Sequence, residues 1–347
     1  MKMTAHKILF TCFTVCVLMA GQSCRKELCY NHWEHSSSVK ADITADYIRE
    51  WEIDNLSEWE RNWDEELFDS KYEDHIPELP GGLRILVYRN GGYEIRNIAP
   101  EGELVQLYEG DHSLLFYNND TEYLLFDNLG TSASAMATTR TRTRFSLDGT
   151  DSKTPTRGYN PPDMLYGCYV PSYWGERKYE PDPMPISLRP LVYTYLIVAE
   201  FDKGIEYVKR ARGELDGVAT GVYLQSGTTS EEAGAILFDT DVCRMTDYGI
   251  VAPVQSFGIP GYPYEDYAST KADGTFTLTL EVELLNGNTK KYDPVDVTSI
   301  LEAHPRGGVI RVSGFEVTDE EGTAGGSGFE VDVDGWGDYE DIPLPIG

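Results

Sequence analysis

Cys24 is the residue to which the sequence assigns the most specific chemistry. It follows a basic start at Lys2 and Lys7 and an apolar run over residues 8–20, and a charged stretch comes directly after it. An apolar run of this length is too short to cross a bilayer comfortably and is typical of a secretory signal. We therefore expect residues 1–23 to be removed and the Cys24 thiol to carry lipid as the first mature residue.

The alternative is an ordinary signal peptide followed by an incidental cysteine. Gln22 fits poorly with the small residues that precede a bacterial lipidation cysteine. Cleavage just before a cysteine that stands at an abrupt change in charge nevertheless favours lipidation. Residues 24–38 are polar, serine-rich and aperiodic, so we expect them to form a tether.

Three carboxylates near the C-terminus, Asp332, Asp334 and Asp338, are the best candidates for metal ligands. Two stand at alternate positions before Gly335, with further acids beyond it, which approximates a calcium loop. The first and last ligand positions depart from that pattern. The alternation of acids with apolar residues over 329–334 also fits a half-buried strand, and this is the interpretation we favour. No cofactor is expected.

Trp59 and Trp63 belong to an acidic, aromatic-rich segment and are four residues apart. Exposed tryptophans could form a platform for sugar rings, so both are candidates for glycan contact. Aromatic residues at helical spacing more often cover one face of a sandwich, and this alternative is favoured. The same spacing indicates a short helix within residues 55–68.

Catalytic signals are absent from the sequence. It contains no Gly-x-Ser-x-Gly elbow, no HExxH motif and no phosphate-binding glycine loop with its lysine. Acidic residues are so numerous that pairing two of them as acid and base carries no information. Cys168 and Cys243 are far apart in sequence, and we expect two buried free thiols rather than a bridge. The protein is predicted not to be an enzyme.

The composition limits the partners and the number of domains. Lys and Arg number 29 against 58 Asp and Glu, which gives a net charge of −29. Such a surface repels nucleic acid and excludes it as a partner. The 347 residues exceed one ordinary core, and a hydrophobic fraction of 41% is that of a globular chain. Two domains are expected.

Short strands separated by tight turns run through both halves of the chain. Residues 83–127 form a meander in which Asn90-Gly91 is a strong hairpin signal, and residues 138–145 alternate threonine with arginine as in a solvated edge strand. We predict an all-β protein of two antiparallel β-sandwiches with minor helices. The predicted ranges are a signal peptide at 1–23, a tether at 24–38, and domains at 39–182 and 183–347.

The mature chain resembles the fimbrillin-like lipoproteins of Bacteroidales. The resemblance rests on CRKELCYNHWEH after the signal, VKADITADY, LRILVYRNGGYE, and the region from YDPVDVTSILEAHPRGGVIRVSGFEV to GGSGFEVDVDGWGDYEDI. It implies two transthyretin-like sandwiches, export to the outer membrane with a lipid anchor and exposure at the cell surface. It also implies fimbrillin-like subunits as partners, in adhesion or pilus assembly.

The same resemblance implies assembly by strand exchange, in which a protease cuts after an arginine beyond the first strand. Arg49 and Arg61 lie in the matching region. The ending over residues 342–347 has prolines two apart, which leaves only one edge able to pair as a strand. We therefore expect an anchor or accessory subunit rather than a stalk subunit. The alternative is a surface glycan-binding lipoprotein.

Overall fold

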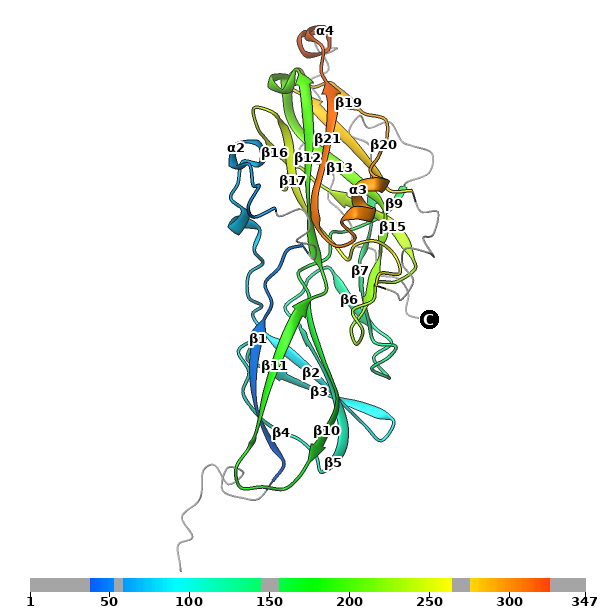
Figure 1. Ribbon diagram of the computed structural model, residues 1–347. Coiled ribbons are helices and arrows are strands. Elements are labelled where there is room, and N and C mark those ends of the chain that lie inside the picture. Colours follow the sequence, from blue (N-terminus) through cyan, green and yellow to red (C-terminus); the bar gives the residue numbers. More distant parts are fainter. Residues whose placement is uncertain (1–37, 53–58, 145–155, 264–274, 325–347) are drawn as a thin grey trace, which may run out of the picture.

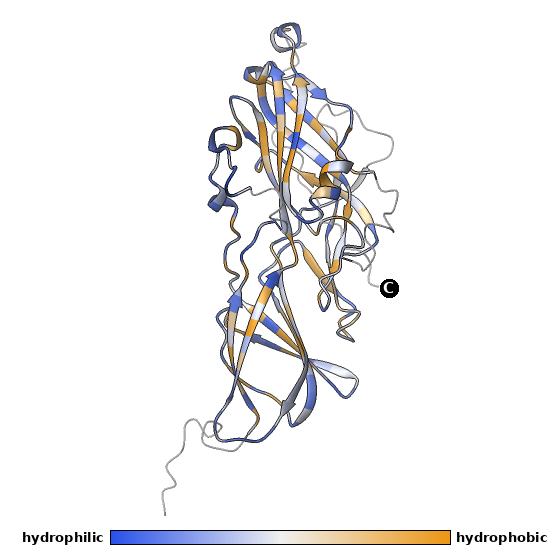
Figure 2. Cartoon of the chain, viewed as in Figure 1, coloured by the Kyte–Doolittle hydropathy of each residue, from blue (hydrophilic) through white to orange (hydrophobic). Residues whose placement is uncertain are grey.

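The computed structural model describes residues 38–52, 59–144, 156–263 and 275–324. These residues form two β-sandwiches placed end to end in an elongated molecule (Figure 1). Apolar residues concentrate along the strands of both sandwiches (Figure 2). The predicted all-β fold with minor helices is confirmed.

The first sandwich is one seven-stranded sheet, in the order β3-β2-β5-β10-β11-β1-β4, that folds over on itself. Among the described residues, strand pairing joins its two layers only between β10 and β11, at Tyr166↔Pro190 and Gly167↔Arg189. Both layers contribute buried side chains to one core. The strands are β1 (Lys40–Tyr47), β2 (Leu83–Arg89), β3 (Gly92–Ile98), β4 (Leu104–Gln106), β5 (Gly110–Asn118), β10 (Tyr166–Gly175) and β11 (Asp182–Pro190).

The hairpin of β2 and β3 forms where the sequence predicts it. Asn90 and Gly91 both have positive φ, 51° and 77°, as a two-residue turn that follows strand twist requires. Arg89 pairs with Gly92 directly across the turn. The turn therefore sets which residues of β2 and β3 face the core.

The second sandwich packs a four-stranded sheet, in the order β16-β17-β12-β21, against a seven-stranded sheet, in the order β19-β18-β13-β15-β9-β8 with β20 beside β18. The four-stranded sheet consists of β12 (Tyr193–Lys203), β16 (Arg244–Met245), β17 (Gly249–Ser256) and β21 (Gly308–Glu316). The other consists of β8 (Thr141–Arg144), β9 (Thr156–Tyr159), β13 (Val208–Ala219), β15 (Ala233–Phe238), β18 (Thr277–Leu284), β19 (Thr289–Lys291) and β20 (Val295–Asp296).

A small third sheet lies where the two sandwiches meet. It consists of β6 (Leu124–Asp127), β7 (Met136–Thr139) and β14 (Gly221–Tyr223). Its apolar side chains share one core with the outer faces of β2 and β5 and with Phe257, which follows β17. This shared core joins the sandwiches through side-chain packing as well as through the chain.

Three strand pairs are parallel, which departs from the predicted antiparallel sheets. They are β1 with β11, β12 with β21, and β15 with β9. Parallel neighbours need long connections, and each of these pairs joins strands that are far apart in sequence. No tight turn between them exists, so the local patterns could not reveal the pairing.

The chain crosses between the two sandwiches more than once, and its last crossing lies between β11 and β12. Residues 183–190, assigned from the sequence to the second domain, lie in β11 and pair with β1 and β10. Conversely, β8 and β9 come from the predicted first domain and join the sheet of β15. The edge strand predicted at 138–145 is correct only in part. Strand β8 lies at the edge of that sheet, but Thr138 and Thr139 belong to β7 at the centre of another sheet, and the Arg142 side chain is largely buried beside Asp239.

The described helices are short. They are α2 (Glu65–Phe68), α3 (Thr298–Ala303), α4 (Asp319–Thr323) and the 3-10 turns at Tyr72–His75 and Ile205–Tyr207. The helix expected within residues 55–68 is therefore only one turn long in the described part of that range. It begins after Asp64, whose carboxylate accepts a hydrogen bond from the Leu67 N–H at 3.0 Å.

Candidate functional site

The first strand, β1, is an integral part of the first sandwich. It runs parallel to β11 from Ala41 to Tyr47 and antiparallel to β4 at its beginning. Val39, Ala41 and Ile43 are buried in the core. The Tyr47 hydroxyl donates to the Pro100 carbonyl at 2.7 Å. Loss of this strand would expose a core face and two strand edges.

The two candidate processing arginines lie beyond β1, and both are exposed. Arg49 follows the strand by two residues, and its Nε donates to the Pro77 carbonyl at 2.7 Å. Arg61 lies in the turn that Asn62 closes on Trp59 with a 3.1 Å backbone hydrogen bond. Cleavage at either arginine stays a prediction.

Trp59 and Trp63 contribute to an aromatic cluster on the outer face of the sheet of β12, β17 and β21. The cluster covers Leu196, Val198 and Val309. The Trp63 ring meets the Trp51 ring edge-on, with centroids 5.9 Å apart, and its Nε1 donates to the Ser70 carbonyl at 2.6 Å. The Trp59 ring lies 5.8 Å from the His304 ring.

Both tryptophans are half-buried, and their rings contact the protein's own side chains. This is the arrangement expected of tryptophans that cover a sandwich. Glycan contact at these two residues stays a prediction without direct support. The most exposed aromatic side chains in the described chain lie elsewhere, at Trp174 and Tyr179, which are 70% and 74% exposed.

The remaining predicted site residues, Cys24, Asp332, Asp334 and Asp338, lie outside the described residues. Within the described ranges, no group of three or more His, Cys, Asp or Glu side chains is placed to hold a metal ion. In that same part of the chain, no helix is long and apolar enough to span a bilayer.

Cys168 and Cys243 are both free thiols. Cys243 is buried, and burial raises the pKa of its thiol to about 12. Such a thiol stays protonated and unreactive near neutral pH. Cys168 is only half-buried, so the prediction of two buried thiols holds for Cys243 alone, although burial also raises the pKa of the Cys168 thiol.

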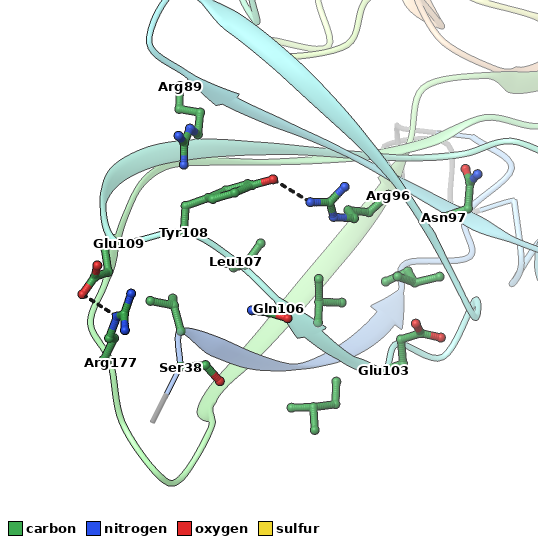
Figure 3. A pocket seen from close by; sticks show the side chains of 14 residues that line it. Ser38, Arg89, Arg96, Asn97, Glu103, Gln106, Leu107, Tyr108, Glu109 and Arg177 are labelled. Atoms are coloured by element: carbon green, nitrogen blue, oxygen red, sulfur yellow. Dashed lines mark hydrogen bonds and ion pairs between the residues drawn. The ribbon is translucent and has the colours of Figure 1, made fainter. Parts of the chain in front are cut away.

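An open groove of about 1120 Å³ lies at the side of the first sandwich, and the sequence patterns did not single it out. Residues of β3 and β4 line its two sides. Its charged and aromatic groups come from Arg89, Arg96, Glu103, Tyr108, Glu109 and Arg177 (Figure 3). The register of β2 and β3 contains the signal that could have revealed it. Arg89 and Arg96 occupy the same alternating positions as core residues of their strands and so face inward.

Tyr108 organises the polar groups of this groove. The Arg89 guanidinium lies over the Tyr108 ring, 4.0 Å from the ring centroid. The Tyr108 hydroxyl donates a hydrogen bond to the Glu94 carboxylate and accepts one from Arg96 Nη2 at 2.8 Å. The hydrogen bond from Tyr108, followed by the nearby arginines, lowers the pKa of the Glu94 carboxyl. Arg177 pairs with Glu109 at 3.0 Å where the groove meets solvent.

Comparisons with known proteins agree with this architecture. Residues 71–239 match the family model described as a domain of unknown function, DUF5119. A Bacteroides ovatus protein named "Putative fimbrium anchoring subunit Fim4B" is 23% identical over 296 residues, which are 78% of this chain and 86% of that protein. The predicted resemblance to fimbrillin-like proteins of Bacteroidales is thereby confirmed.

Solved structures extend the comparison to the fold. A Bacteroides ovatus crystal structure described as a putative adhesin has a TM-score of 0.54 and 18% identity, and it covers 81% of this chain and 94% of that chain. The fimbrial anchor protein Mfa2 of Porphyromonas gingivalis aligns with 79% of this chain and 90% of that chain, with a TM-score of 0.41 and 11% identity. The first of these shows that the chain shares the fold of that structure.

Proposed function

We propose that this chain is a pilus-related adhesion subunit of the bacterial surface, of the anchor or accessory type. The observation that carries the proposal is the similarity to a fimbrium anchoring subunit over 78% of the chain. The two-sandwich adhesin fold supports it. The role is structural and non-enzymatic, and its partners are other fimbrial subunits. The lipid on Cys24 holds the protein at the outer membrane.

The setting of β1 supports an anchor over a repeating stalk subunit. The strand follows the lipidation site in the chain, so a subunit that keeps β1 also keeps its lipid. Seven registered pairs with β11 and three buried side chains hold the strand in the sandwich. The paired prolines at residues 343 and 345 also make the C-terminus a poor strand donor.

Replacement of Cys24 by serine in native cells tests the lipid anchor. With labelled palmitate, we expect wild-type protein to carry label in the membrane fraction, and Cys24→Ser to lose both the label and the membrane association. Cys29→Ser removes a neighbouring cysteine and should keep both. Unlabelled wild-type protein would contradict the anchor.

The same membrane fraction tests the partner and the processing. We expect fimbrial subunits to co-purify with wild-type protein after cross-linking, and N-terminal analysis to find the lipidated end. Surface protein that begins at Glu50 or Asn62 would show cleavage after Arg49 or Arg61 and would exclude a retained anchor. Recovery with bound glycan and no subunit would favour the alternative, a glycan-binding lipoprotein.

A further inference from the structure

The connection between β10 and β11 forms the end of the first sandwich that lies away from the second sandwich (Figure 1). The start of β1 lies at the same end, because Ser38 forms a bridge with Lys178 and β1 runs beside β11 from its first residues. The described chain therefore begins here. We call this end the proximal tip and define it as residues 38–40, 109–111 and 174–182.

Two aromatic side chains at the proximal tip are largely exposed. Trp174, on β10, is 70% exposed, and Tyr179, in the connection to β11, is 74% exposed. Every other large hydrophobic side chain in the described ranges is less exposed than these two. Tryptophan and tyrosine combine an apolar ring with a polar group and are enriched where membranes meet water. The tip thus presents the two residue types that favour a lipid–water interface.

The position of the tip along the chain places it near the membrane. Only residues 25–37 separate Ser38 from Cys24, and even fully extended they span at most about 50 Å. A lipid on Cys24 therefore keeps the tip close to the bilayer, a step that rests on the proposed function. A second contact with the same bilayer is then intramolecular, so a weak affinity of two rings is enough to hold it.

The charged groups of the proximal tip do not favour anionic lipid. Arg177 pairs with Glu109 at 3.0 Å, and Lys178 pairs with Asp182 at 2.9 Å. Acidic side chains remain in excess over basic ones, so an anionic surface would repel the tip. A membrane contact here depends on the rings and fits zwitterionic headgroups. The charged residues of the tip are Lys40, Glu109, Asp111, Glu176, Arg177, Lys178, Glu180 and Asp182.

We propose that the proximal tip rests on the lipid–water interface and inserts Trp174 and Tyr179 among zwitterionic headgroups. The rings bury apolar surface there, while the indole N–H and the phenol O–H keep polar partners. The lipid on Cys24 sets where the chain is held, and the two rings set how the first sandwich stands. Helix α4, the last described element, lies at the opposite end of the molecule (Figure 1). The second sandwich is thereby held away from the membrane.

Quenching of tryptophan fluorescence on vesicles tests this contact. The mature chain, residues 24–347, carries an N-terminal histidine tag and Trp33→Phe, which removes a tryptophan close to the tag. Phosphatidylcholine vesicles with a small fraction of nickel-chelating lipid hold it, with or without a lipid whose headgroup carries a nitroxide. We expect the nitroxide to quench part of the fluorescence and Trp174→Ala to lose that part. No quenching, or the same quenching in Trp174→Ala, would overturn the proposal.

Two tyrosine variants test whether both rings hold the tip. Tyr179→Ala should lower the quenching of Trp174 at least about twofold, because it removes one of the two interfacial rings. Tyr248→Ala is the matched control, because that side chain is 44% exposed in the second sandwich and its loss should leave the quenching unchanged. Circular dichroism confirms that the variants are folded. Equal quenching in Tyr179→Ala and in the parent chain would overturn the two-ring contact.

The lipid composition separates ring insertion from attraction between charges. The quenching should persist in about 1 M salt, where charges are screened beyond about 3 Å, and should weaken when phosphatidylglycerol replaces part of the phosphatidylcholine. Quenching that needs phosphatidylglycerol and disappears in salt would overturn the proposal. Binding of soluble polysaccharide from the native envelope at Trp174, without quenching on vesicles, would assign the rings to sugar instead.

The tag takes the place of the lipid, so this experiment does not depend on Cys24. Quenching on vesicles together with unlabelled protein in cells would keep the membrane-binding tip and reject the lipid anchor. Palmitate-labelled protein in cells without quenching on vesicles would keep the anchor and reject the tip.

Discussion

Arg212 and Glu281 form a buried ion pair between β13 and β18. Arg212 Nε and Nη2 donate to one Glu281 carboxylate oxygen at 3.0 and 2.9 Å, and both side chains are less than a tenth exposed. Glu283 lies two residues further along β18 and pairs with Lys209 and Arg210, which are more exposed to solvent. One strand therefore holds a glutamate in a buried ion pair and a glutamate in a partly exposed one.

Glu281→Gln should destabilise the protein by about 3–5 kcal/mol, because it removes the negative charge that pairs with the buried Arg212 guanidinium. Glu283→Gln should cost less than about 1 kcal/mol, because solvent screens its arginine and lysine partners. The free energy of unfolding in urea, measured for both variants at pH 7, checks the difference. Similar losses for the two variants would show that burial does not set the energy of the Glu281 pair.

At the scale of elements, the segment from Trp59 to His75 acts as a cover for β12. This strand is apolar on both faces: Tyr195 and Ile197 point into the second core, and Leu196 and Val198 point outward under the aromatic cluster. A strand buried on both faces needs a layer on each side. Trp59 and Trp63 belong to this second layer, and they pack on the sheet although the helix beside them is only one turn long.

Trp63→Ala should lower the stability by about 3–5 kcal/mol, because the ring contacts Trp51, Phe68 and Tyr72 and its loss opens a cavity. Trp174→Ala is the matched control, since that ring is 70% exposed on β10 and its removal should change stability by less than about 0.5 kcal/mol. Denaturant unfolding followed by circular dichroism measures both. A Trp63→Ala variant with unchanged stability would favour the alternative in which Trp63 is part of an exposed platform for sugar rings.

At the scale of the whole molecule, the shared core couples the two sandwiches. Leu86 and Tyr117 point outward from the first sandwich and pack in one cluster with Val222 of the small sheet and with Phe257. All four side chains are less than a tenth exposed. Buried apolar contact of this kind resists independent motion of domains more than a flexible linker would.

The mature chain should therefore unfold in a single calorimetric transition, since neither sandwich can open without exposing this core. Phe257→Ala should cost about 3–5 kcal/mol and separate the transition into two, because it removes a ring at the centre of the junction. Scanning calorimetry tests both expectations. Two transitions in the unmodified protein would show that the sandwiches are independent.

Local patterns determined much of this protein. Alternating apolar residues, the Asn90-Gly91 turn and the β-branched edge strand at Thr141–Arg144 all act over a few residues, so the all-β class and the first hairpin followed from the sequence alone. The lipidation prediction at Cys24 is equally local. It rests on the order of basic, apolar and small residues before one cysteine.

Only the tertiary structure decided which distant segments meet. The parallel partner of β1 is β11, far along the chain, and no short-range pattern encodes such a pairing. The groove likewise depends on two edges that separate after Ile98, and on the inward direction of Arg89. Long-range pairing and side-chain direction follow from burying one common core, so they become visible only once the whole sandwich is assembled.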